Sequence, residues 1–576
     1  MNIPRHEHPN PQWQRDNWRN LNGEWEFDFD FGVSARERRA YEGGALARTI
    51  TVPFCPESKL SGIGYTDFIP SVCYRRTFEL AEGELDGRVL LHFGAVDFHS
   101  YVYINGKLAG EHIGGYSSFS LDITDKAHVG ENIVFVIAED DVRSGEQPTG
   151  KQSTRYESYS CFYTRTTGIW QTVWLEFLPR DYVKSCKYYP DITRGKLLVM
   201  GEASGRGEVV LTATYEGKPM GRAVAEIRGG RFTAVLALCE LHLWEIGCGR
   251  LYDLDIAFGN DTVHSYFGMR EVALDGLKFT LNGKAVFQRM VLDQGFYPDG
   301  IYTSRDDETL RRDIELSQAF GFHGARLHQK VFEKRFLYHC DKMGYIVWGE
   351  HANWGINEKN AVAEGNFLCE WMEIVERDFN SPALIGWCPF NETWGYYEKK
   401  EKVRLIESVY RVTKLYDTTR PCIDTSGNYH LDKKEIHDLH DYEQDVVRFA
   451  ESYDPEQMTK GVIKDQIERH EKGVQPYFGE PVFISEYGGI RWAPETDSGW
   501  GYGNAPKTLE EYVERYCKLT DILISNPYIM GLCYTQLYDV EQEKNGLYYY
   551  DRSAKFDEET VAKMRAAMEK KAAIEE

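Results

Sequence analysis

Residues 386–395 read GWCPFNETWG, and residues 481–489 read PVFISEYGG. Each stretch starts as an apolar run of strand-forming residues and stops abruptly at one glutamate, Glu392 in the first and Glu486 in the second. Aromatic and small residues flank both glutamates. Strands that are buried on both faces read as continuous apolar runs of this kind. The two stretches therefore predict two buried strands that each end in an acidic residue.

The chain around these stretches alternates between apolar runs and longer amphipathic stretches from residue 275 onward. One of the amphipathic stretches, residues 403–416, has the spacing of a helix. Eight strands that alternate with helices over about 300 residues are the count of a (β/α)8 barrel, or TIM barrel. The predicted strands are 286–292, 323–327, 345–348, 383–390, 421–424, 436–442, 482–485 and 529–537.

On this count Glu392 ends the fourth strand and Glu486 ends the seventh. Both glutamates then lie at the C-terminal mouth of the barrel, where enzymes of this fold carry their chemistry. The alternative is that each glutamate pairs with a neighbouring arginine or caps the next helix. Two strand-terminal glutamates with the same aromatic flanks favour a functional site over that alternative.

The N-terminal half has a different pattern. Residues 1–180 contain about ten short alternating runs, and Asn105-Gly106 is a hairpin signal after one of them, so a jelly-roll sandwich is predicted. Residues 181–271 continue with strands at shorter spacing, which is typical of a small immunoglobulin-like sandwich. We therefore expect a multidomain chain in which a catalytic TIM barrel, residues 272–576, follows these two sandwiches.

Composition excludes several classes of protein. The 576 residues carry a net charge of −23, which argues against nucleic acid or an anionic membrane as a partner. The twelve cysteines are scattered without zinc spacing, as expected of reduced thiols. No apolar stretch approaches the ~18 residues of a membrane span, and the N-terminus lacks the apolar core of a secretory signal. A cytoplasmic location is therefore expected.

Two carboxylates at one barrel mouth suit the hydrolysis of a glycosidic bond. In a retaining enzyme one carboxylic acid protonates the leaving oxygen, and a carboxylate ~5–5.5 Å away attacks the sugar as nucleophile. Glu392, between Asn391 and Trp394, is the candidate acid/base, and the negative charge of Glu486 is expected to raise its pKa. Glu486 is the candidate nucleophile and must stay ionised.

Three further residues are candidates to support this chemistry. Tyr442 and Arg326, both near strand ends, can donate hydrogen bonds to Glu486, and Asn391 can bond the 2-hydroxyl group of the sugar. The run of two histidines and two aspartates at residues 437–441 raises the alternative of a metal site. Alternation along a strand points these side chains to opposite faces, so we expect a sugar contact or a supporting hydrogen bond there, with no metal and no cofactor.

Several motifs together resemble glycoside hydrolase family 2, the β-galactosidase and β-glucuronidase family. Asn391-Glu392 and residues 485–488, SEYG, are similar to the acid/base and nucleophile motifs of that family. The resemblance implies a sugar-binding jelly roll, an immunoglobulin-like domain, a catalytic barrel, a retaining mechanism on a carbohydrate and a homo-oligomer. Similar landmarks occur in the same order at residues 15–25 (RDNWRNLNGEW), 52–58 (VPFCPES), 167–171 (TGIWQ) and 266–270 (YFGMR).

The barrel also departs from the family pattern. Where the family usually shows Arg-Thr-Ser-His-Tyr-Pro, residues 326–331 read RLHQKV, so His328 lies one place before the usual histidine position. The first strand carries Asp293 where the family often has a histidine pair, which makes Asp293 a candidate ligand for a sugar hydroxyl group.

The identity of the sugar depends on the stretch after the eighth strand. Relatives that act on uronic acids resemble one another in an Asn-x-Lys pair there, whereas this chain has Glu543 and Asn545 at those places. An acidic side chain repels a uronate, so a terminal β-galactoside is the leading prediction, although Arg491 keeps a β-glucuronide or β-galacturonide open. A catalytically silent carbohydrate-binding protein is a further alternative. A loop of the first domain at residues 160–163 is a candidate to reach the pocket.

Overall fold

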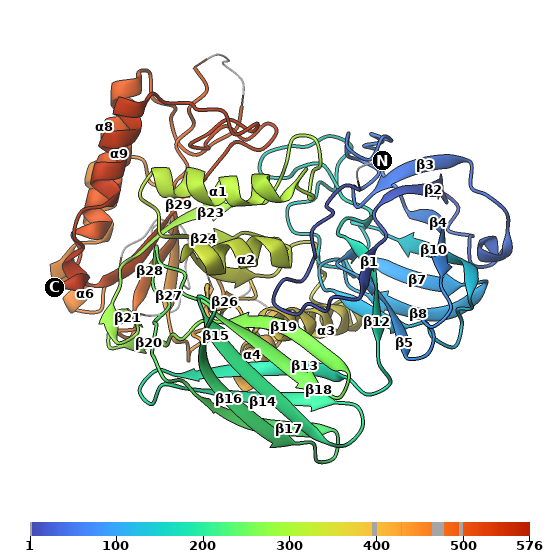
Figure 1. Cartoon of the computed structure of the whole chain (residues 1–576). Coiled ribbons are helices and arrows are strands. Elements are labelled where there is room, and N and C mark those ends of the chain that lie inside the picture. Colours follow the sequence, from blue (N-terminus) through green and yellow to red (C-terminus); the bar gives the residue numbers. More distant parts are fainter. Residues whose placement is uncertain (1–2, 394–399, 428, 464–476, 495–498) are drawn as a thin grey trace.

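The computed structural model describes residues 3–393, 400–427, 429–463, 477–494 and 499–576. Figure 1 shows an N-terminal β-sandwich (blue), a second sandwich (green) and a C-terminal region that carries parallel strands and the long helices. This arrangement confirms the predicted fold class of two sandwiches followed by a TIM barrel. The boundaries after residues 180 and 271 stay our proposals.

The first sandwich consists of two antiparallel sheets whose strands bury one face each. One sheet has the order β1 (Trp18–Asn20), β12 (Val173–Leu178), β5 (Arg88–Phe93) and β9 (Phe119–Asp122). A short pair, β6 (Val96–Asp97) and β11 (Gly168–Ile169), forms a separate two-stranded sheet. The other sheet has the order β3 (Arg48–Val52), β2 (Gly23–Phe29), β4 (Ser71–Leu80), β10 (Gly130–Glu139), β7 (His99–Ile104) and β8 (Lys107–Ile113).

The predicted hairpin turn at Asn105-Gly106 joins β7 to β8. Both turn residues have positive φ, 51° and 77°, which a two-residue hairpin turn of this type requires. The side-chain amide of Asn105 donates to the carbonyl of Lys126 at 3.0 Å and so fixes the turn to a neighbouring loop.

The second sandwich is smaller and its strands alternate between buried and exposed residues. The burial of β17 (Arg231–Ala237) alternates at every residue, as expected of a strand with one face on a core. This strand forms a sheet with β14 (Lys196–Ala203) and β13 (Val183–Asp191). The opposite sheet has the order β16 (Lys218–Glu226), β15 (Glu208–Tyr215), β18 (Tyr252–Phe258) and β19 (Asp261–Phe267).

The C-terminal region contains a curved sheet of parallel strands whose residues are almost all buried. A small antiparallel sheet precedes it, formed by β20 (Val272–Asp275), β21 (Lys278–Leu281) and β22 (Lys284–Ala285). The parallel sheet has the order β26 (Leu384–Cys388), β25 (Ile346–Glu350), β24 (Gly324–Leu327), β23 (Gln288–Asp293), β29 (Ile529–Thr535), β28 (Val482–Gly488) and β27 (His437–Asp441).

The strand predicted at residues 421–424 forms no regular strand, and this prediction is wrong. The segment pairs with the end of β26 only through isolated bridges, Trp387 with Cys422 and Asn391 with Ser426. On its other side the carboxylate of Asp438 accepts a hydrogen bond from the backbone N–H of Gly427 at 2.8 Å. An irregular segment therefore occupies the place between β26 and β27 where an eighth strand was expected.

Helices follow most of the parallel strands and cover the outside of the barrel (Figure 1). The helix predicted at residues 403–416 is present as α4 and starts three residues earlier. The described helices are α1 (Asp307–Ala319), α2 (Lys334–Met343), α3 (Ala361–Asp378), α4 (Lys400–Tyr416), α5 (Val446–Ser452), α6 (Pro455–Thr459), α8 (Leu509–Ile524) and α9 (Glu558–Met568), with short 3-10 turns at Ala40–Glu42 and Ala573–Glu575.

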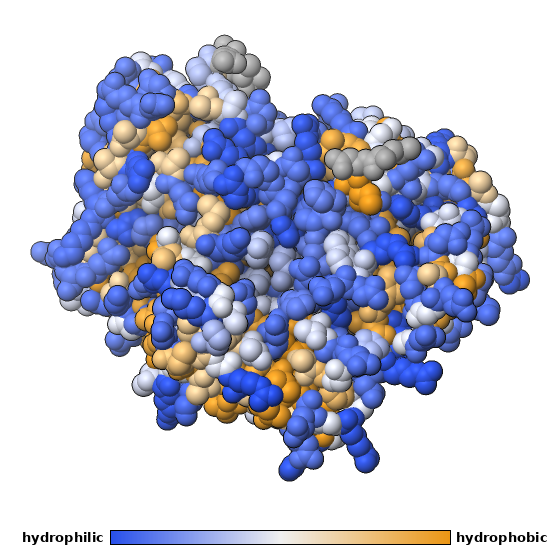
Figure 2. Space-filling model, viewed as in Figure 1, coloured by the Kyte–Doolittle hydropathy of each residue, from blue (hydrophilic) through white to orange (hydrophobic). Residues whose placement is uncertain are grey.

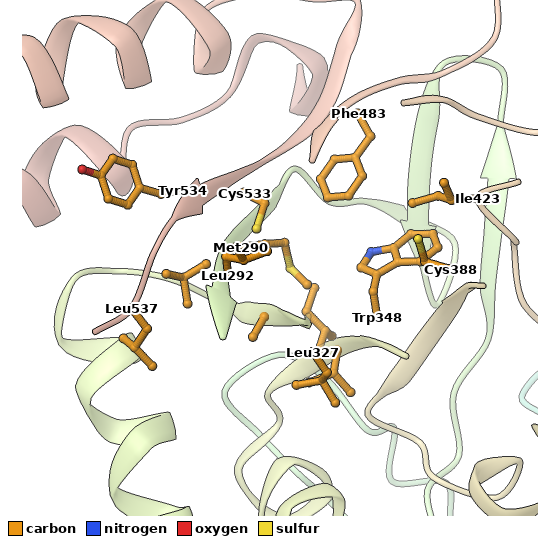
Figure 3. Close-up of a cluster of buried hydrophobic side chains, with 14 of the residues drawn as sticks. Met290, Leu292, Leu327, Trp348, Cys388, Ile423, Phe483, Cys533, Tyr534 and Leu537 are labelled. Carbon is orange, nitrogen blue, oxygen red and sulfur yellow. The ribbon is translucent and has the colours of Figure 1, made fainter. Parts of the chain in front are cut away.

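The lower part of the barrel interior is apolar. Figure 3 shows buried side chains from β23, β24, β25, β26, β28 and β29 and from the 421–426 segment gathered in one cluster. Trp348 of β25 stacks on Phe483 of β28 with ring centroids 5.9 Å apart. Because β25 and β28 are not neighbours in the sheet, this contact crosses the barrel. Chemistry is therefore left to the polar residues at the ends of the strands.

Hydrophilic residues cover most of the face seen in Figure 2, and apolar residues gather mainly over the second sandwich. Exposed apolar side chains there include Met200, Val224 and Val235. Among the described helices, none is long and apolar enough to cross a membrane.

Candidate active site

The structure brings Glu392 and Glu486 together at the C-terminal mouth of the barrel. Glu392 follows β26, and Glu486 lies two residues before the end of β28. One carboxylate oxygen of each glutamate and a ring nitrogen of His440 all lie within 4.8 Å of one another. The two strand-terminal glutamates therefore face one shared space, as the sequence predicted.

Irregular backbone aims both glutamates into this space. The register of β28 against β29 shifts between Ile484 and Tyr487, so Glu486 sits in a bulge, a device that re-aims a side chain. Glu392 has φ of 45°, a left-handed conformation that residues other than glycine seldom adopt. Its backbone N–H donates to the carbonyl of Ser426 at 2.8 Å, which holds the residue in this conformation. Strained residues of this kind cluster at functional sites.

Glu486 is buried and accepts hydrogen bonds at both carboxylate oxygens. The Tyr442 hydroxyl donates to Oε2, and Nη1 of Arg326 donates to Oε1 at 3.2 Å. Nε2 of His440 lies 3.4 Å from the same Oε1. Burial alone raises the pKa of Glu486, but the charges of His440 and Arg326 act in the opposite direction, and the net pKa is lowered. Glu486 therefore stays ionised at neutral pH.

Arg326 organises the base of the site. Its fully buried guanidinium donates to the carbonyl of Ser485 at 2.7 Å, to Oδ1 of Asn391 at 3.2 Å and to Oε1 of Glu350 at 2.5 Å. Nδ1 of His328 lies 3.2 Å from the other oxygen of Glu350. Burial, followed by the charge of Lys151, lowers the pKa of His328 well below its usual value. His328 is therefore a neutral partner of Glu350 at the edge of the site.

His440 connects the two glutamates. Its Nδ1 lies 3.0 Å from Oε1 of Glu392, and its Nε2 lies 2.7 Å from the Ser426 hydroxyl oxygen as well as near Glu486. Burial lowers the pKa of His440, but Glu486 and Glu392 raise it further, so the net pKa is above the usual value. Sequence reasoning placed His440 in a candidate run without giving it this role, because only tertiary structure shows which face of β27 meets the glutamates.

The site offers ligands for a metal but also contains donors that compete with one. Glu392, His440 and Glu486 are three ligand-type residues, yet Glu486 already accepts hydrogen bonds from Arg326 and Tyr442. In the 437–441 run, Oδ1 of Asp438 accepts from Gly427 N at 2.8 Å and from the Ser485 hydroxyl at 2.5 Å, and the alternative of a metal there stays a prediction. The arrangement suits a hydrogen-bonded carboxylate rather than a cation.

Asn391 has a donor to offer to a ligand. Its Oδ1 accepts from Arg326, while its backbone carbonyl accepts from Nδ2 of Asn353 at 3.0 Å and from Nε1 of Trp354 at 3.1 Å. Its own Nδ2 is buried, and no described residue accepts a hydrogen bond from it. Buried amide donors are normally satisfied, so Nδ2 suits a hydroxyl group of a substrate.

Three predicted site residues are not in this cluster. The Asp293 carboxylate accepts hydrogen bonds from the Tyr538 hydroxyl and, at 2.9 Å, from the backbone N–H of Gly295. Arg491 donates to the carbonyl of Gly499 at 3.1 Å. Trp394 lies outside the described residues. Asp293 and Arg491 thus form hydrogen bonds with other residues of the protein. Their role as substrate ligands stays a prediction.

A strap from the first sandwich, residues 149–163, crosses the mouth of the barrel. The backbone N–H of Thr149 donates to the carbonyl of Trp354 at 2.7 Å, and Nε2 of Gln542 donates to the carbonyl of Ser160 at 2.8 Å. The Tyr163 hydroxyl donates to the buried carboxylate of Glu543. Nζ of Lys151 lies 4.0 Å from the centroid of the Trp354 ring. Sequence reasoning named the loop at residues 160–163 but missed Lys151, which no motif marks.

Comparison with known proteins agrees with this architecture. Residues 18–175 match the model of the sugar binding domain of glycosyl hydrolases family 2, and residues 272–522 match the TIM barrel domain of the same family. A β-galactosidase of Thermoanaerobacterium thermosulfurigenes is 25% identical over 343 residues, which are 55% of this chain and 46% of that protein. A β-glucuronidase of Paenibacillus borealis is 24% identical over 542 residues, 86% of each chain.

Solved structures agree on the fold. A β-glucuronidase of an uncultured Clostridium species superposes with a TM-score of 0.79 at 20% identity, covering 99% of both chains. Four curated relatives, the β-galactosidase included, are matched over 41 to 50% of their own length, so this chain spans about half the length of those relatives. Two domain models of one family cover most of the chain in the expected order. The chain therefore belongs to glycoside hydrolase family 2.

Proposed function

We propose that the chain is a retaining exo-β-glycosidase that works by a two-glutamate double displacement. The observation that carries this proposal is the approach of the Glu392 and Glu486 carboxylates, whose nearest ligand atoms lie within 4.8 Å. Retaining enzymes hold their two carboxyl groups ~5–5.5 Å apart, whereas inverting enzymes leave ~6.5–9.5 Å for a water molecule.

Glu486 is the nucleophile in this proposal. Its carboxylate, kept ionised by Arg326 and His440, attacks the anomeric carbon while Glu392 donates a proton to the leaving oxygen. The bond between the anomeric carbon and the leaving oxygen breaks as the glycosyl–Glu486 ester forms. Glu392, now a carboxylate, takes a proton from water, whose oxygen attacks the same carbon and releases Glu486.

A terminal β-D-galactoside is the leading substrate in this proposal. Glu543 is buried, and its oxygens accept from the Tyr163 hydroxyl and from Nδ2 of Asn545 at 2.9 Å, so its carboxyl group is a fixed part of the mouth. A second carboxylate from a uronide would be repelled there. The relatives include a protein named β-galactosidase, which agrees with a neutral sugar.

A β-hexuronide, from glucuronic or galacturonic acid, is the second candidate. The observation that favours it is Lys151, whose ammonium group lies over the Trp354 ring, which in turn donates a hydrogen bond to the carbonyl of Asn391 beside Glu392. Relatives named β-glucuronidase also match this chain. Arg491 gives this candidate less support than the sequence suggested, because its guanidinium donates to the carbonyl of Gly499.

The test is hydrolysis of 4-nitrophenyl β-D-galactoside, β-D-glucuronide and β-D-galacturonide by the purified chain and its Glu486→Gln variant. We expect the galactoside to be hydrolysed fastest, and we expect at least a 10³-fold loss of kcat in the variant because the nucleophile is removed. Faster hydrolysis of either uronide would replace the leading substrate with the second candidate. Binding of sugar without turnover by the unsubstituted chain would support a silent carbohydrate-binding protein instead.

A further inference from the structure

Lys151 is a buried cation that forms no ion pair with any carboxylate in the described part of the chain. Its side chain leaves the strap beside Gly150, whose backbone lies so close to the barrel that a Cβ there would overlap the carbonyl oxygen of Gln329. Only 5% of the residue is exposed, and its Nζ stacks over the ring of Trp354. No side-chain hydrogen bond of this Nζ to another described residue is present either. The N–H donors of Lys151 are therefore available to a ligand.

The group stays charged despite its burial. Burial lowers the pKa of Lys151, but the carboxylates of Glu392, Glu486 and Glu543, together with Cys161, raise it above the usual lysine value. The other cations at this mouth are already engaged, since Arg326 pairs with Glu350 and Glu486. Lys151 is thus the cation of the described pocket that remains for a substrate.

Tyr163 links Glu543 to Lys151: its backbone N–H donates to the carbonyl of Lys151 at 2.8 Å, and its hydroxyl donates to the Glu543 carboxylate. Each carboxylate oxygen of Glu543 accepts one hydrogen bond from the protein, from Tyr163 and Asn545, and retains a lone pair. Burial raises its pKa to about 7, and among its charged neighbours Lys151 has the largest opposing effect. Lys151 and Glu543 therefore lie near each other beside Tyr163, and among the described residues they form no ion pair within 4.0 Å.

A hydroxyl group suits this pair of side chains better than a carboxylate does. A hydroxyl oxygen accepts a hydrogen bond from an ammonium group and donates its own hydrogen to a carboxylate. A uronate carboxylate accepts only, so its contact with Lys151 would place it against Glu543. We propose that Lys151 and Glu543 hold one hydroxyl group of the glycone between them and so select a neutral sugar over an acidic one. This inference takes one assumption from the proposed function, namely that a sugar binds with its ring over Glu486.

The experiment measures kcat/KM of Lys151→Met, Glu543→Gln and the double variant on the aryl glycoside that the chain hydrolyses fastest. Methionine keeps the apolar stem against Trp354 but removes the charge. Each single variant should lose about 10- to 100-fold, as expected for a hydrogen bond to a charged group. The double variant should lose less than the product of the two losses, because both residues hold the same hydroxyl group. Lys107→Met, at an exposed position of the same sandwich, is the matched control and should leave kcat/KM unchanged.

Calorimetric titration separates this inference from the proposed function. D-galactose, D-glucose, D-galacturonate and D-glucuronate are titrated into Glu486→Gln, with and without Lys151→Met. A neutral sugar should bind tightest, and Lys151→Met should weaken it at least tenfold even if the parent chain proves to have no hydrolytic activity. Tightest binding of a uronate, an unchanged affinity in Lys151→Met, no binding of any sugar, or losses of kcat/KM that simply multiply would each overturn the inference.

Discussion

His440 lies between the two glutamates and interacts with both of them. Its ring nitrogens meet Glu392 at 3.0 Å and Glu486 at 3.4 Å, and these carboxylates keep its pKa above the usual histidine value despite its burial. A cation beside Glu486 favours the ionised form of that carboxylate. We infer that His440 is a positioning residue that keeps Glu486 ready to attack.

His440→Asn tests this role at the level of the residue. Loss of the cation should raise the pKa of Glu486, so the acidic limb of the kcat/KM profile should move to higher pH, and kcat should fall about 100-fold. The sign follows because Glu486 must be ionised, and a group with a higher pKa ionises only at higher pH. An unchanged acidic limb, as expected of the exposed control His264→Asn, would contradict the role.

Some residues of the site could be predicted from the sequence, and others could not. Glu392 and Glu486 were identifiable because each follows an apolar run that ends at the barrel mouth, and Tyr442 because it lies at the end of a predicted strand. Asp293 follows the same rule yet binds Gly295 two residues ahead, a local turn that aspartate side chains often form. Lys151 has no signal in the sequence, because the strap that carries it comes from another domain.

The strap at residues 149–163 is the element that joins the first sandwich to the mouth of the barrel. Thr149 and Gly150 both donate backbone hydrogen bonds to the carbonyl of Trp354, and Trp354 in turn donates to the carbonyl of Asn391. Gly150 has φ of 55° and no room for a Cβ beside Gln329. The position of Lys151 therefore depends on a close backbone contact.

Gly150→Ala should displace the strap. We expect kcat/KM to fall at least tenfold, because Lys151 moves with the strap and the contact with Trp354 weakens. The matched control is Gly64→Ala, where φ is 66° and nothing lies within 4 Å of the new Cβ, so only the left-handed backbone cost of about 1 kcal/mol remains. Equal kcat/KM in the two variants would show that the strap has no part in the reaction.

Most of the parallel strands, but not the segment at residues 421–424, were predicted correctly from the sequence. Seven of the eight predicted parallel strands are present, because long apolar runs identify buried strands. Residues 421–424 have the same apolar character, but Pro421 lacks a backbone donor, and the Asp438 side chain binds Gly427 where a second neighbour would pair. Whether a segment pairs with a neighbouring strand on each side depends on the tertiary structure, and its apolar sequence alone does not determine it.

At the scale of the whole molecule, a buried carboxyl group links the first sandwich to the barrel. Oε1 of Glu370, on α3, accepts from the backbone N–H of Tyr116 at 2.6 Å, and Oε2 lies 3.6 Å from His351. Burial raises the pKa of Glu370 to about 8 and lowers the pKa of His351 to about 3, so both groups are neutral at pH 6. Glu370 thus contributes most to stability when it is protonated.

Glu370→Gln should change how stability depends on pH. A carboxyl group whose pKa rises on folding stabilises the fold below its unfolded pKa of ~4.3, and that contribution is lost as the pH rises through about 8. Glutamine cannot ionise. The Tm of the variant minus the Tm of the parent chain should therefore increase from pH 5 to pH 8, by roughly 2–4 °C. Glu376→Gln, on the same helix with a half-exposed carboxylate, is the control. A Tm difference that stays constant with pH would contradict this linkage.

The whole-molecule predictions of a homo-oligomer and a cytoplasmic location remain predictions. The order of the two sandwiches and the barrel was predictable because strand spacing changes at each transition in the sequence. How the strap docks between the first sandwich and the barrel mouth depends on contacts between residues about 200 positions apart, such as Thr149 with Trp354.

The central claim is that Glu486 forms a covalent bond to the sugar while Glu392 transfers protons. Its most direct test is mass spectrometry of the chain after incubation with the activated 2-deoxy-2-fluoro analogue of its best aryl glycoside, because the fluorine slows release of the intermediate. We predict one glycosyl adduct on the peptide that contains Glu486, and none in Glu486→Gln. An adduct on another residue, or hydrolysis that inverts the anomeric centre without any adduct, would contradict the account.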